Sequence, residues 1–378
     1  MAENKEKKVL NVPNLRFPEF DGEWEKCKLS DLCTFFSGGT PNSSNKDFYG
    51  GKIAFIRSGE LHANKTELFV TQKGFESSSA KMVDVGDLLL AMYGATSGDI
   101  AISKIKGAIN QAILCIRTKQ NKKFIESVWN KHVSKILMKY LQGGQGNLST
   151  DIVKSLSFSF PTLAEQERIA KLMALLDERI STQNKIIEDL KKLKSAISKK
   201  LLDNDRWTTY KIQDIAKIGR GRVISSVEIE RQKHPLYPVY SSQTSNDGIM
   251  GYLDDYMFDG EYITWTTDGA NAGTVFYRKG KFNCTNVCGT LKIQPKYDCY
   301  FVSLVLQQAT QKYVSFNLAN PKLMNNIMAS IKIKMPDIEI QKQLSKIFQT
   351  LDSCLLVHQR TCDMYLREKQ YLLCQMFI

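Results

Sequence analysis

The sequence is poor in the motifs on which most recognisable active sites depend. It has four histidines among 378 residues, and they do not have the spacing of metal ligands. It contains neither the G-x-x-x-x-G-K-[ST] loop that cradles phosphates nor the H-E-x-x-H motif of zinc enzymes. Asn320-Pro321 is followed by Lys-Leu, unlike the Asn-Pro-Pro-aromatic motif of amino-methyltransferases. We therefore expect no metal site, no bound cofactor and no catalytic residues in this chain.

Long apolar runs are also lacking. The stretch nearest to a membrane span, "DLLLAMYGA" at 87–95, is far shorter than the roughly 20 residues that a bilayer requires. The N-terminus has charge but no apolar core, so we expect no signal peptide. The nine cysteines are scattered, which favours reduced thiols over a disulfide or zinc framework. These features predict a cytoplasmic protein that does not contact a membrane.

Positive charge is in excess. Lysine and arginine number 52 against 39 aspartates and glutamates, which gives a net charge of +13. Such an excess favours a polyanionic partner, most simply nucleic acid, although a generally basic surface that binds nothing acidic has the same composition.

The sequence repeats itself over a long period. "PTLAEQERIAKL" begins at Pro161 and "PDIEIQKQLSKI" begins at Pro336, an offset of 336 − 161 = 175 residues. Upstream, "WEKCKLSDL" from Trp24 matches "WTTYKIQDI" from Trp207 at an offset of 207 − 24 = 183 residues. The matched pairs include Gly38/Gly221, Gln166/Gln341, Asp177/Asp352 and Lys194/Lys369. Two copies at this spacing indicate a duplicated domain with pseudo-twofold symmetry rather than a solenoid.

Each copy ends in a long amphipathic helix. Thr162 can act as N-cap with Glu165 completing a capping box, whereas Asp337 caps the second helix without the box. Apolar residues then recur every 3.5 positions, as in a coiled coil, and polar residues interrupt both helices at equivalent places. We expect the two helices to pair antiparallel as a spacer of about 40 residues, or roughly 60 Å. The predicted seam contains Ile169, Leu176, Gln183, Leu190 and Lys194 in the first helix, and Leu344, Leu351, His358, Tyr365 and Lys369 in the second.

Short β-type runs separated by Gly, Ser, Asn and Asp turns fill the rest of each half. The fold class is therefore predicted as α+β, with two pseudo-symmetric globular domains separated by the helices. The predicted boundaries are 1–160 for the first domain, with a leader at 1–23, then 161–203, 204–335 and 336–378 for the first helix, second domain and second helix. We expect the leader to fold back beside the second helix.

Polar loops flanked by aromatic residues occur in both halves, in "AFIRSGEL", "AMYGATSG" and "TWTTDGANAGTVFYRKGKFNCTN". Arginine suits guanine edges and Asn or Gln suits adenine edges, whereas Lys, Ser and Thr suit phosphates. For any single position a solvated turn explains the residue equally well. The candidate DNA-binding residues are Arg57, Ser58, Tyr93, Thr96, Ser97, Asn110 and Gln111 in the first half, and Ser241, Gln243, Thr266, Thr267, Asn271, Lys279, Lys281, Asn283 and Asn286 in the second.

This organisation resembles the specificity subunit of type I restriction–modification enzymes. The resemblance rests on the two Trp-initiated units and on the two helix openings of the form Pro-x-x-x-x-Gln, and it covers nearly the whole chain. It implies two target recognition domains, each reading one half of a bipartite asymmetric site in double-stranded DNA. It also implies docking of two methyltransferase subunits and of restriction subunits. S-adenosylmethionine, ATP and magnesium would then act in those partners.

Two other classes compete with this interpretation. A basic coiled-coil adaptor that binds RNA or protein would share the charge and the helices. A self-contained nuclease ranks last, because no acidic cluster with an adjacent lysine stands out.

Overall fold

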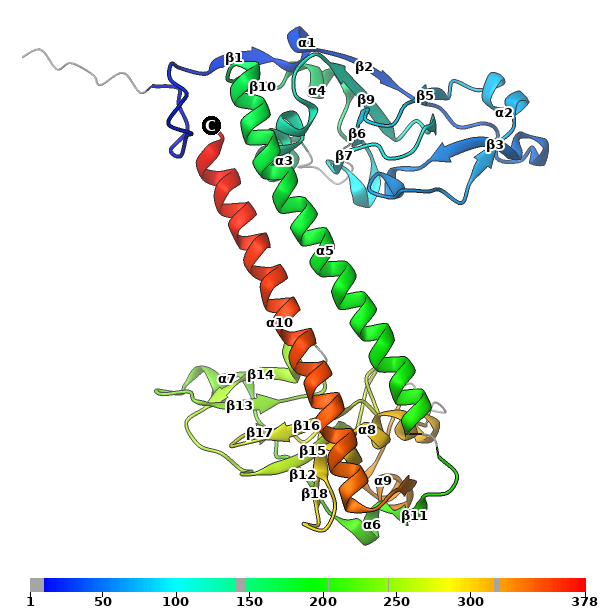
Figure 1. Cartoon of the computed structure of the whole chain (residues 1–378), viewed down its shortest axis with the longest axis vertical. Coiled ribbons are helices and arrows are strands. Elements are labelled where there is room, and N and C mark those ends of the chain that lie inside the picture. Colours follow the sequence, from blue (N-terminus) through cyan, green and yellow to red (C-terminus); the bar gives the residue numbers. More distant parts are fainter. Residues whose placement is uncertain (1–9, 141–146, 203, 244, 316–319) are drawn as a thin grey trace, which may run out of the picture. The chain divides into compact units, whose positions relative to one another are not determined.

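The computed structural model describes residues 10–140, 147–202, 204–243, 245–315 and 320–378 (Figure 1). The chain divides into two compact units: unit 1 comprises residues 1–184 and 360–378, and unit 2 comprises residues 185–359. Two long helices, α5 (Leu163–Leu201) and α10 (Ile338–Met376), contribute to both units. The predicted α+β class is confirmed, and residues 1–9 of the leader lie outside the described residues.

Unit 1 contains sheets with the strand orders β1-β10, β2-β9-β6-β7 and β4-β3-β8-β5. Strands β3 and β8 are parallel, whereas the other pairs are antiparallel. The strands are β1 (Glu25–Lys28), β2 (Cys33–Ser37), β3 (Tyr49–Ile56), β4 (Phe69–Val70), β5 (Lys81–Val83), β6 (Leu88–Ala91), β7 (Ile100–Ile102), β8 (Gly107–Ile109), β9 (Ile113–Thr118) and β10 (Ser157–Phe160). The shorter helices are α1 (Leu29–Leu32), η1 (Lys46–Phe48), η2 (Ser58–Glu60), α2 (Gln72–Glu76), η3 (Gly94–Thr96), α3 (Lys122–Tyr140) and α4 (Thr150–Ser155).

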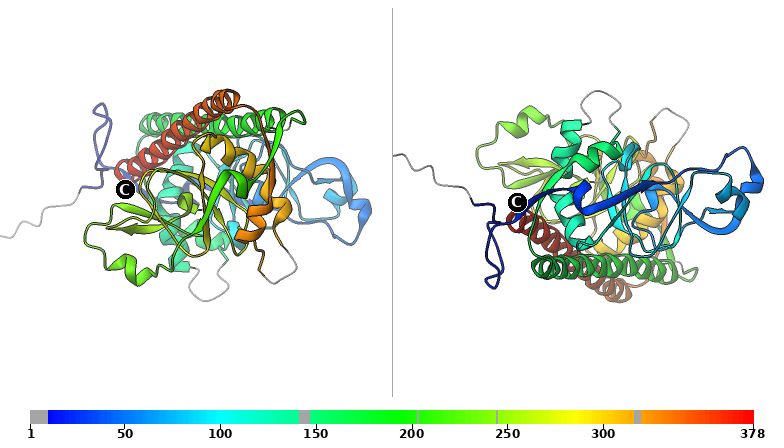
Figure 2. Two further views of the ribbon diagram at one scale, coloured as in Figure 1. Left: turned by 90° about the horizontal axis from the view of Figure 1, so that it is seen from below. Right: turned by 90° about the horizontal axis from the view of Figure 1, so that it is seen from above.

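Unit 2 has the strand orders β11-β19, β12-β18-β15-β16 and β14-β13-β17, which match those of unit 1 except that no strand of the described residues takes the place of β5. Figure 2 gives two further views of the ribbon. The parallel pair of unit 2, β13 and β17, corresponds to β3 and β8, so the sequence duplication is also a duplication of fold. The strands are β11 (Thr208–Lys211), β12 (Ala216–Arg220), β13 (Tyr237–Tyr240), β14 (Ile249–Leu253), β15 (Glu261–Thr266), β16 (Val275–Lys279), β17 (Asn283–Cys284), β18 (Cys288–Ile293) and β19 (Lys332–Met335). The shorter helices are α6 (Ile212–Ile215), α7 (Ser226–Glu230), η4 (Ser245–Gly248), α8 (Cys299–Ala309), η5 (Thr310–Tyr313) and α9 (Asn325–Ser330).

The matched tryptophans hold equivalent places in the two cores. The ring of Trp24 meets the edge of Phe124 on α3 at 5.7 Å, and Trp207 meets Phe301 on α8 at 5.8 Å. The last turns of α10 join the core of unit 1, where Leu373, Met376 and Phe377 are buried, with Phe377 packing its ring on Phe124. Aromatic packing of this kind accounts for the conspicuous Trp at the start of each copy.

The glutamine of each helix opening is buried, and both the nitrogen and the oxygen of its side-chain amide form hydrogen bonds. The Gln166 side chain donates to the Pro161 carbonyl (2.9 Å) and accepts from the Asn121 amide, just before α3 (3.2 Å). The Gln341 side chain donates to the Pro336 carbonyl (2.8 Å) and accepts from the amide of Asp298, the N-cap of α8 (3.0 Å). Each glutamine thus fixes the start of a long helix to the start of a domain helix, which explains the doubled motif.

The predicted capping box is only half correct. The Thr162 hydroxyl accepts from the Glu165 amide at 3.4 Å, as predicted. The Glu165 carboxylate, however, accepts hydrogen bonds from Arg16 at 2.7 and 2.8 Å, because the leader packs over the helix start. The Leu15 amide of the leader also donates to the Gln375 carbonyl of α10 at 2.9 Å. For its described residues, the prediction that the leader lies beside the second helix is therefore confirmed.

The matched polar positions of the two helices form ion pairs. In unit 1 Lys369 of α10 contacts Asp177 of α5 at 2.5 Å, and in unit 2 Lys194 of α5 contacts Asp352 of α10. In unit 1 the partner of Asn184 is Cys362, so α10 numbers fall as α5 numbers rise and the helices pair antiparallel there. All ten predicted seam residues are buried or half-buried.

The Asp177 carboxylate generates a prediction on pH. Burial raises its pKa, but hydrogen bonds from Lys123 and Lys369 outweigh burial and leave the pKa below the ordinary value. A depressed pKa stabilises the fold at pH above the ordinary aspartate pKa, and this stabilisation is lost as the pH falls through the folded value. We expect Asp177→Asn to be less stable at neutral pH and to lose less stability on acidification.

Thermal unfolding of the wild type, Asp177→Asn and the control Asp189→Asn between neutral and acid pH measures this difference. Asp189 is an exposed residue of the same helix. Parallel pH profiles for the wild type and Asp177→Asn would contradict the assignment.

Candidate nucleic-acid interface

In unit 1, four connecting segments meet at one edge of the paired sheets. The Asn110 amide donates to the Ile56 carbonyl (3.3 Å), which joins the segments after β8 and β3. The Gly39 amide donates to Ile109 (3.2 Å), and the Met92 amide donates to Ala112 (2.8 Å). We call segments 38–40, 57–60, 92–97 and 110–112 loop cluster 1. All seven candidates from the first half of the sequence lie in it.

The candidate side chains of loop cluster 1 differ in how strongly they are held. Arg57 is 53% exposed and donates to Glu60 at 3.0 and 3.2 Å. Burial raises the pKa of the Glu60 carboxyl, but hydrogen bonds from Arg57 outweigh burial and lower it. Tyr93 is exposed, and Gln111 accepts a hydrogen bond from Thr40. Ser58, Thr96, Ser97 and Asn110 are half-exposed; Ser97 donates to the Met92 carbonyl and Asn110 accepts from the Ala112 amide.

A hydrogen-bonded histidine–aspartate pair that the sequence did not suggest adjoins loop cluster 1. His62 lies 2.9 Å from Asp99, which connects the chain after η2 to the chain after η3. The hydrogen bond to Asp99 raises the pKa of His62, with burial opposing the shift. The pair keeps the two loops at a fixed separation, and no spacing rule links residues 37 positions apart.

Unit 2 builds the equivalent arrangement. The Thr285 amide donates to Tyr240 (2.9 Å) and the Thr267 amide donates to Val287 (2.9 Å), as Met92 does to Ala112 in unit 1. The Asn271 side chain donates to the Ser242 carbonyl at 3.2 Å. We call segments 220–222, 241–243, 267–273 and 285–287 loop cluster 2.

The matched glycines Gly38 and Gly221 lie in the first segment of loop cluster 1 and loop cluster 2, respectively. A Cβ at Gly38 would lie 1.8 Å from the Ile109 carbonyl oxygen, and one at Gly221 would lie 2.1 Å from that of Cys284. No side chain fits at these distances, so glycine is required for the backbones to approach. The repeat signal at these positions therefore has a steric cause.

Loop cluster 2 has a charged centre that the sequence analysis missed. The Arg220 guanidinium donates to the Asn286 carbonyl (2.6 Å), the Thr267 hydroxyl (3.0 Å) and the Asp268 carboxylate (3.2 Å). Lys322 lies 3.7 Å from the same carboxylate. Arg220 directly precedes the matched Gly221, which was the available signal for its place in the cluster.

Arg278 is a second missed residue, and it fixes the chain that follows Gln243. Its guanidinium is almost fully buried, 3.6 Å above the Tyr240 ring and 4.4 Å from that of Phe276. It donates to the Asp247 carboxylate at 2.6 Å and to the Asp247 carbonyl at 2.8 Å. Asp247 has φ +53°, a left-handed conformation that costs energy for a non-glycine residue. The side-chain amide of Gln243 donates to Ile249 across the same turn.

Four candidates of the second half are not displayed by loop cluster 2. Thr266 and Asn283 are 1% and 0% exposed, so their side chains face the interior and are not available for a direct contact. Lys279 pairs with Glu261 at 3.1 Å, at the opposite end of the β15–β16 pair from Thr266. Lys281 lies over the Tyr256 ring at 4.4 Å. Sequence alternation could not reveal that Thr266 is buried, because the last four residues of β15 are buried on both faces. The remaining candidates, Ser241, Gln243, Thr267, Asn271 and Asn286, belong to loop cluster 2.

Metal-binding clusters and membrane-spanning helices are both absent from the described part of the chain. No group of three or more His, Cys, Asp or Glu side chains there could hold a metal ion. None of the helices described combines the length and apolar character of a membrane span.

Residues 21–192 and 204–362 match the family model described as the type I restriction modification DNA specificity domain. Putative type I specificity subunits of Mycoplasma pneumoniae are similar. S.MpnORF201P is 37% identical over 223 residues, which is 56% of this chain and 90% of that protein. S.MpnORF615P is 38% identical over 229 residues, which is 58% of this chain and 91% of that protein.

Solved structures resemble the whole chain. The S subunit of a type I restriction–modification system from M. genitalium has a TM-score of 0.72 at 17% identity, covering 97% of this chain and 99% of that one. A chain from a type I restriction–modification complex has a TM-score of 0.53 at 13% identity, covering 93% and 96%. At these identities the likeness establishes the fold.

The Arg278 contacts generate a prediction on stability. Arg278→Met keeps the apolar stem but removes the hydrogen bonds that hold Asp247 in a left-handed conformation. We expect a loss of about 2 kcal/mol in the free energy of unfolding, since hydrogen bonds to charged groups contribute about 1.5–3 kcal/mol. Urea denaturation measures the change. Arg231→Met, at an exposed position of the same unit, is the control and should stay within about 0.5 kcal/mol of wild type.

Proposed function

Because the chain belongs to the type I restriction modification DNA specificity family, we propose that each of its units reads one half of a bipartite duplex site through its loop cluster. The predicted role as a specificity subunit follows from that membership. The observation that carries the proposal is the pair of loop clusters, built by the same hydrogen bonds at equivalent strand ends but lined by different side chains.

The side chains offer different readouts in the two units. Loop cluster 1 presents Arg57, Tyr93 and Gln111, whereas loop cluster 2 presents Asn271, Asn286 and the Arg220–Asp268 pair. Arginine pairs with guanine O6 and N7, and amides pair with adenine N6 and N7. Different donor and acceptor sets on one scaffold suit an asymmetric target. The net charge of +13 supplies sequence-independent attraction to phosphates.

The long helices are the proposed spacer and docking surface. In unit 2 they border a groove of about 530 Å³ lined by Ile197, Gln343, Lys346, Ile347, Thr350 and Leu351. The side chain of Ile347 is 45% exposed. Exposed apolar side chains between polar ones suit a helix of another subunit. We assign this surface to a methyltransferase subunit, with two such subunits and the restriction subunits completing the complex. S-adenosylmethionine, ATP and magnesium act in those partners, in the cytoplasm.

The first prediction concerns the half-sites. Arg57→Ala should relax the sequence preference in one half-site only, and Asn271→Ala should relax it in the other. Each should cost about 1–3 kcal/mol if the side chain makes a bidentate base contact. Methylome sequencing of cells that express each variant with the cognate methyltransferase gives both preferences at once. A uniform fall in methylation at all sequences would instead identify a phosphate contact.

The second prediction concerns the spacer. Insertion of four residues near Lys191 in α5 should change or abolish recognition at the original gap between half-sites. The preference within each half-site should persist, because the loop clusters are built inside the units. The same methylome assay gives the gap length. An unchanged gap would exclude the spacer role, and methylation without any sequence preference would exclude the proposed function.

A further inference from the structure

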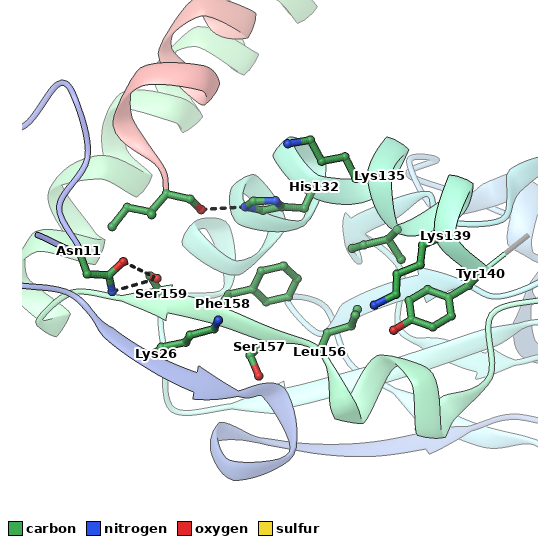
Figure 3. Close-up of a pocket in the computed structure, with 12 residues that line it drawn as sticks. Asn11, Lys26, His132, Lys135, Lys139, Tyr140, Leu156, Ser157, Phe158 and Ser159 are labelled. Carbon is green, nitrogen blue, oxygen red and sulfur yellow. Dashed lines mark hydrogen bonds between the residues drawn. The ribbon is translucent and has the colours of Figure 1, made fainter. Parts of the chain in front are cut away.

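Unit 1 has a concave, basic surface that lies apart from loop cluster 1. It is a cavity of about 380 Å³ between α3 and the β1–β10 pair (Figure 3). We call it the basic cavity. Its lining residues are Asn11, Lys26, His132, Lys135, Ile136, Lys139, Tyr140, Leu156, Ser157, Phe158, Ser159 and Ile378.

Lysines project over an apolar floor in this cavity. Lys26 from β1 and Lys139 from α3 extend toward the same space from opposite sides, and Lys135 lies at its margin (Figure 3). Ile136 and Phe158 are buried beneath them. Long lysine stems cover apolar surface while the ammonium groups stay at the solvent edge. The rim therefore carries lysine ammonium groups that are not held in ion pairs.

Lysines outnumber acidic side chains in the lining of the cavity. None of the lining residues is Asp or Glu, and neither Lys26, Lys135 nor Lys139 forms an ion pair with another described residue. The neighbouring Lys131 donates to the Phe377 carbonyl, and burial followed by repulsion from Lys135 lowers its pKa. An anion placed between Lys26 and Lys139 would be attracted by both ammonium groups.

The cavity lies on the far side of α3 from loop cluster 1. The Trp129 indole of α3 donates to the Gly98 carbonyl at 2.7 Å, directly after η3. A Cβ at Gly98 would lie 2.8 Å from a Val133 methyl group, so this face of α3 touches the loop. Positions 133 and 135 differ by about 200° around a helix, which directs Lys135 and Lys139 away from the loop. The helix α3 therefore lies between this loop and the cavity. A helix is about 10–12 Å across, which is less than the length of one turn of duplex, about 34 Å.

We propose that the basic cavity binds backbone phosphates of the duplex that flanks the half-site read by loop cluster 1. The assignment rests on the proposed function of that cluster, which places a duplex within reach. Lysine ammonium groups and the Ser157 and Tyr140 hydroxyls are suitable donors to phosphate oxygens, and such contacts position a protein without reading sequence. Unit 2 differs at the matched strands. Thr209 replaces Lys26 at the offset of 209 − 26 = 183 residues. Lys334, which lies opposite Thr209 as Ser159 lies opposite Lys26, forms an ion pair with Asp205. Backbone anchoring of this kind therefore belongs to one half-site.

The test is the salt dependence of DNA binding by Lys26→Gln/Lys139→Gln. The control Lys191→Gln/Lys199→Gln removes the same charge from exposed positions of α5. The full chain, with its methyltransferase subunit, is titrated with the cognate duplex and with a duplex whose first half-site is scrambled, across a series of salt concentrations. We expect the double variant to lose affinity for both duplexes equally. The slope of log K against log salt should fall by about 0.9 for each phosphate contact removed, with the cognate-to-scrambled ratio unchanged.

Three outcomes are distinguishable. A slope equal to that of the control variant would overturn the proposal. A variant that keeps its slope but no longer retains the methyltransferase subunit would also overturn it and assign the cavity to a protein partner. A wild type that does not discriminate the two duplexes would refute the proposed function, whereas the salt slopes would still report on the cavity. The single change Lys139→Glu, which repels phosphate, provides a second variant with the same expected direction.

Discussion

The buried side-chain amide at the start of each long helix is the constraint on which both units depend. Gln166 and Gln341 each bind a proline carbonyl on one side and the backbone amide at the start of a domain helix on the other. A buried amide that loses one partner leaves an unsatisfied polar group, so the direction of the helix and the position of the domain helix are set together. The loop clusters are therefore attached to helices and strands whose positions are fixed.

Duplication explains why the scaffold residues are alike in the two copies whereas the loop residues differ. The scaffold positions carry the same chemistry in both copies: tryptophan on phenylalanine, lysine on aspartate, and glycine against a carbonyl oxygen. The loops between them share backbone hydrogen bonds but not side chains. A scaffold that uses backbone contacts to hold its loops can change the loop sequence without loss of shape, which is what recognition of two unlike half-sites requires.

Sequence reasoning reached the repeat, the helices and the fold class because these depend on local periodicity and on matched residues. All seven candidates of the first half lie in loop cluster 1, in segments that connect one strand to the next. Sequence reasoning failed where position depends on long-range pairing. Thr266 and Asn283 looked like loop residues but are buried. Arg220 and Lys322 looked ordinary, but both pair with Asp268, and Arg278 pairs with Asp247, once the sheets have formed. The Glu165 carboxylate was expected to cap its own helix, but it accepts a hydrogen bond from Arg16, which is 149 positions away in the sequence.

The division of the chain has a consequence for synthesis. Unit 2 is a single continuous segment, residues 185–359, and its contacts are complete once that segment has emerged. Unit 1 is discontinuous, and Leu373, Met376 and Phe377 fill the core around Trp24 and Phe124. The core of unit 1 is therefore complete only after the last turns of α10 have been synthesised, which is later than the whole segment that forms unit 2. Folding of unit 1 as a unit thus depends on residues at both ends of the described chain.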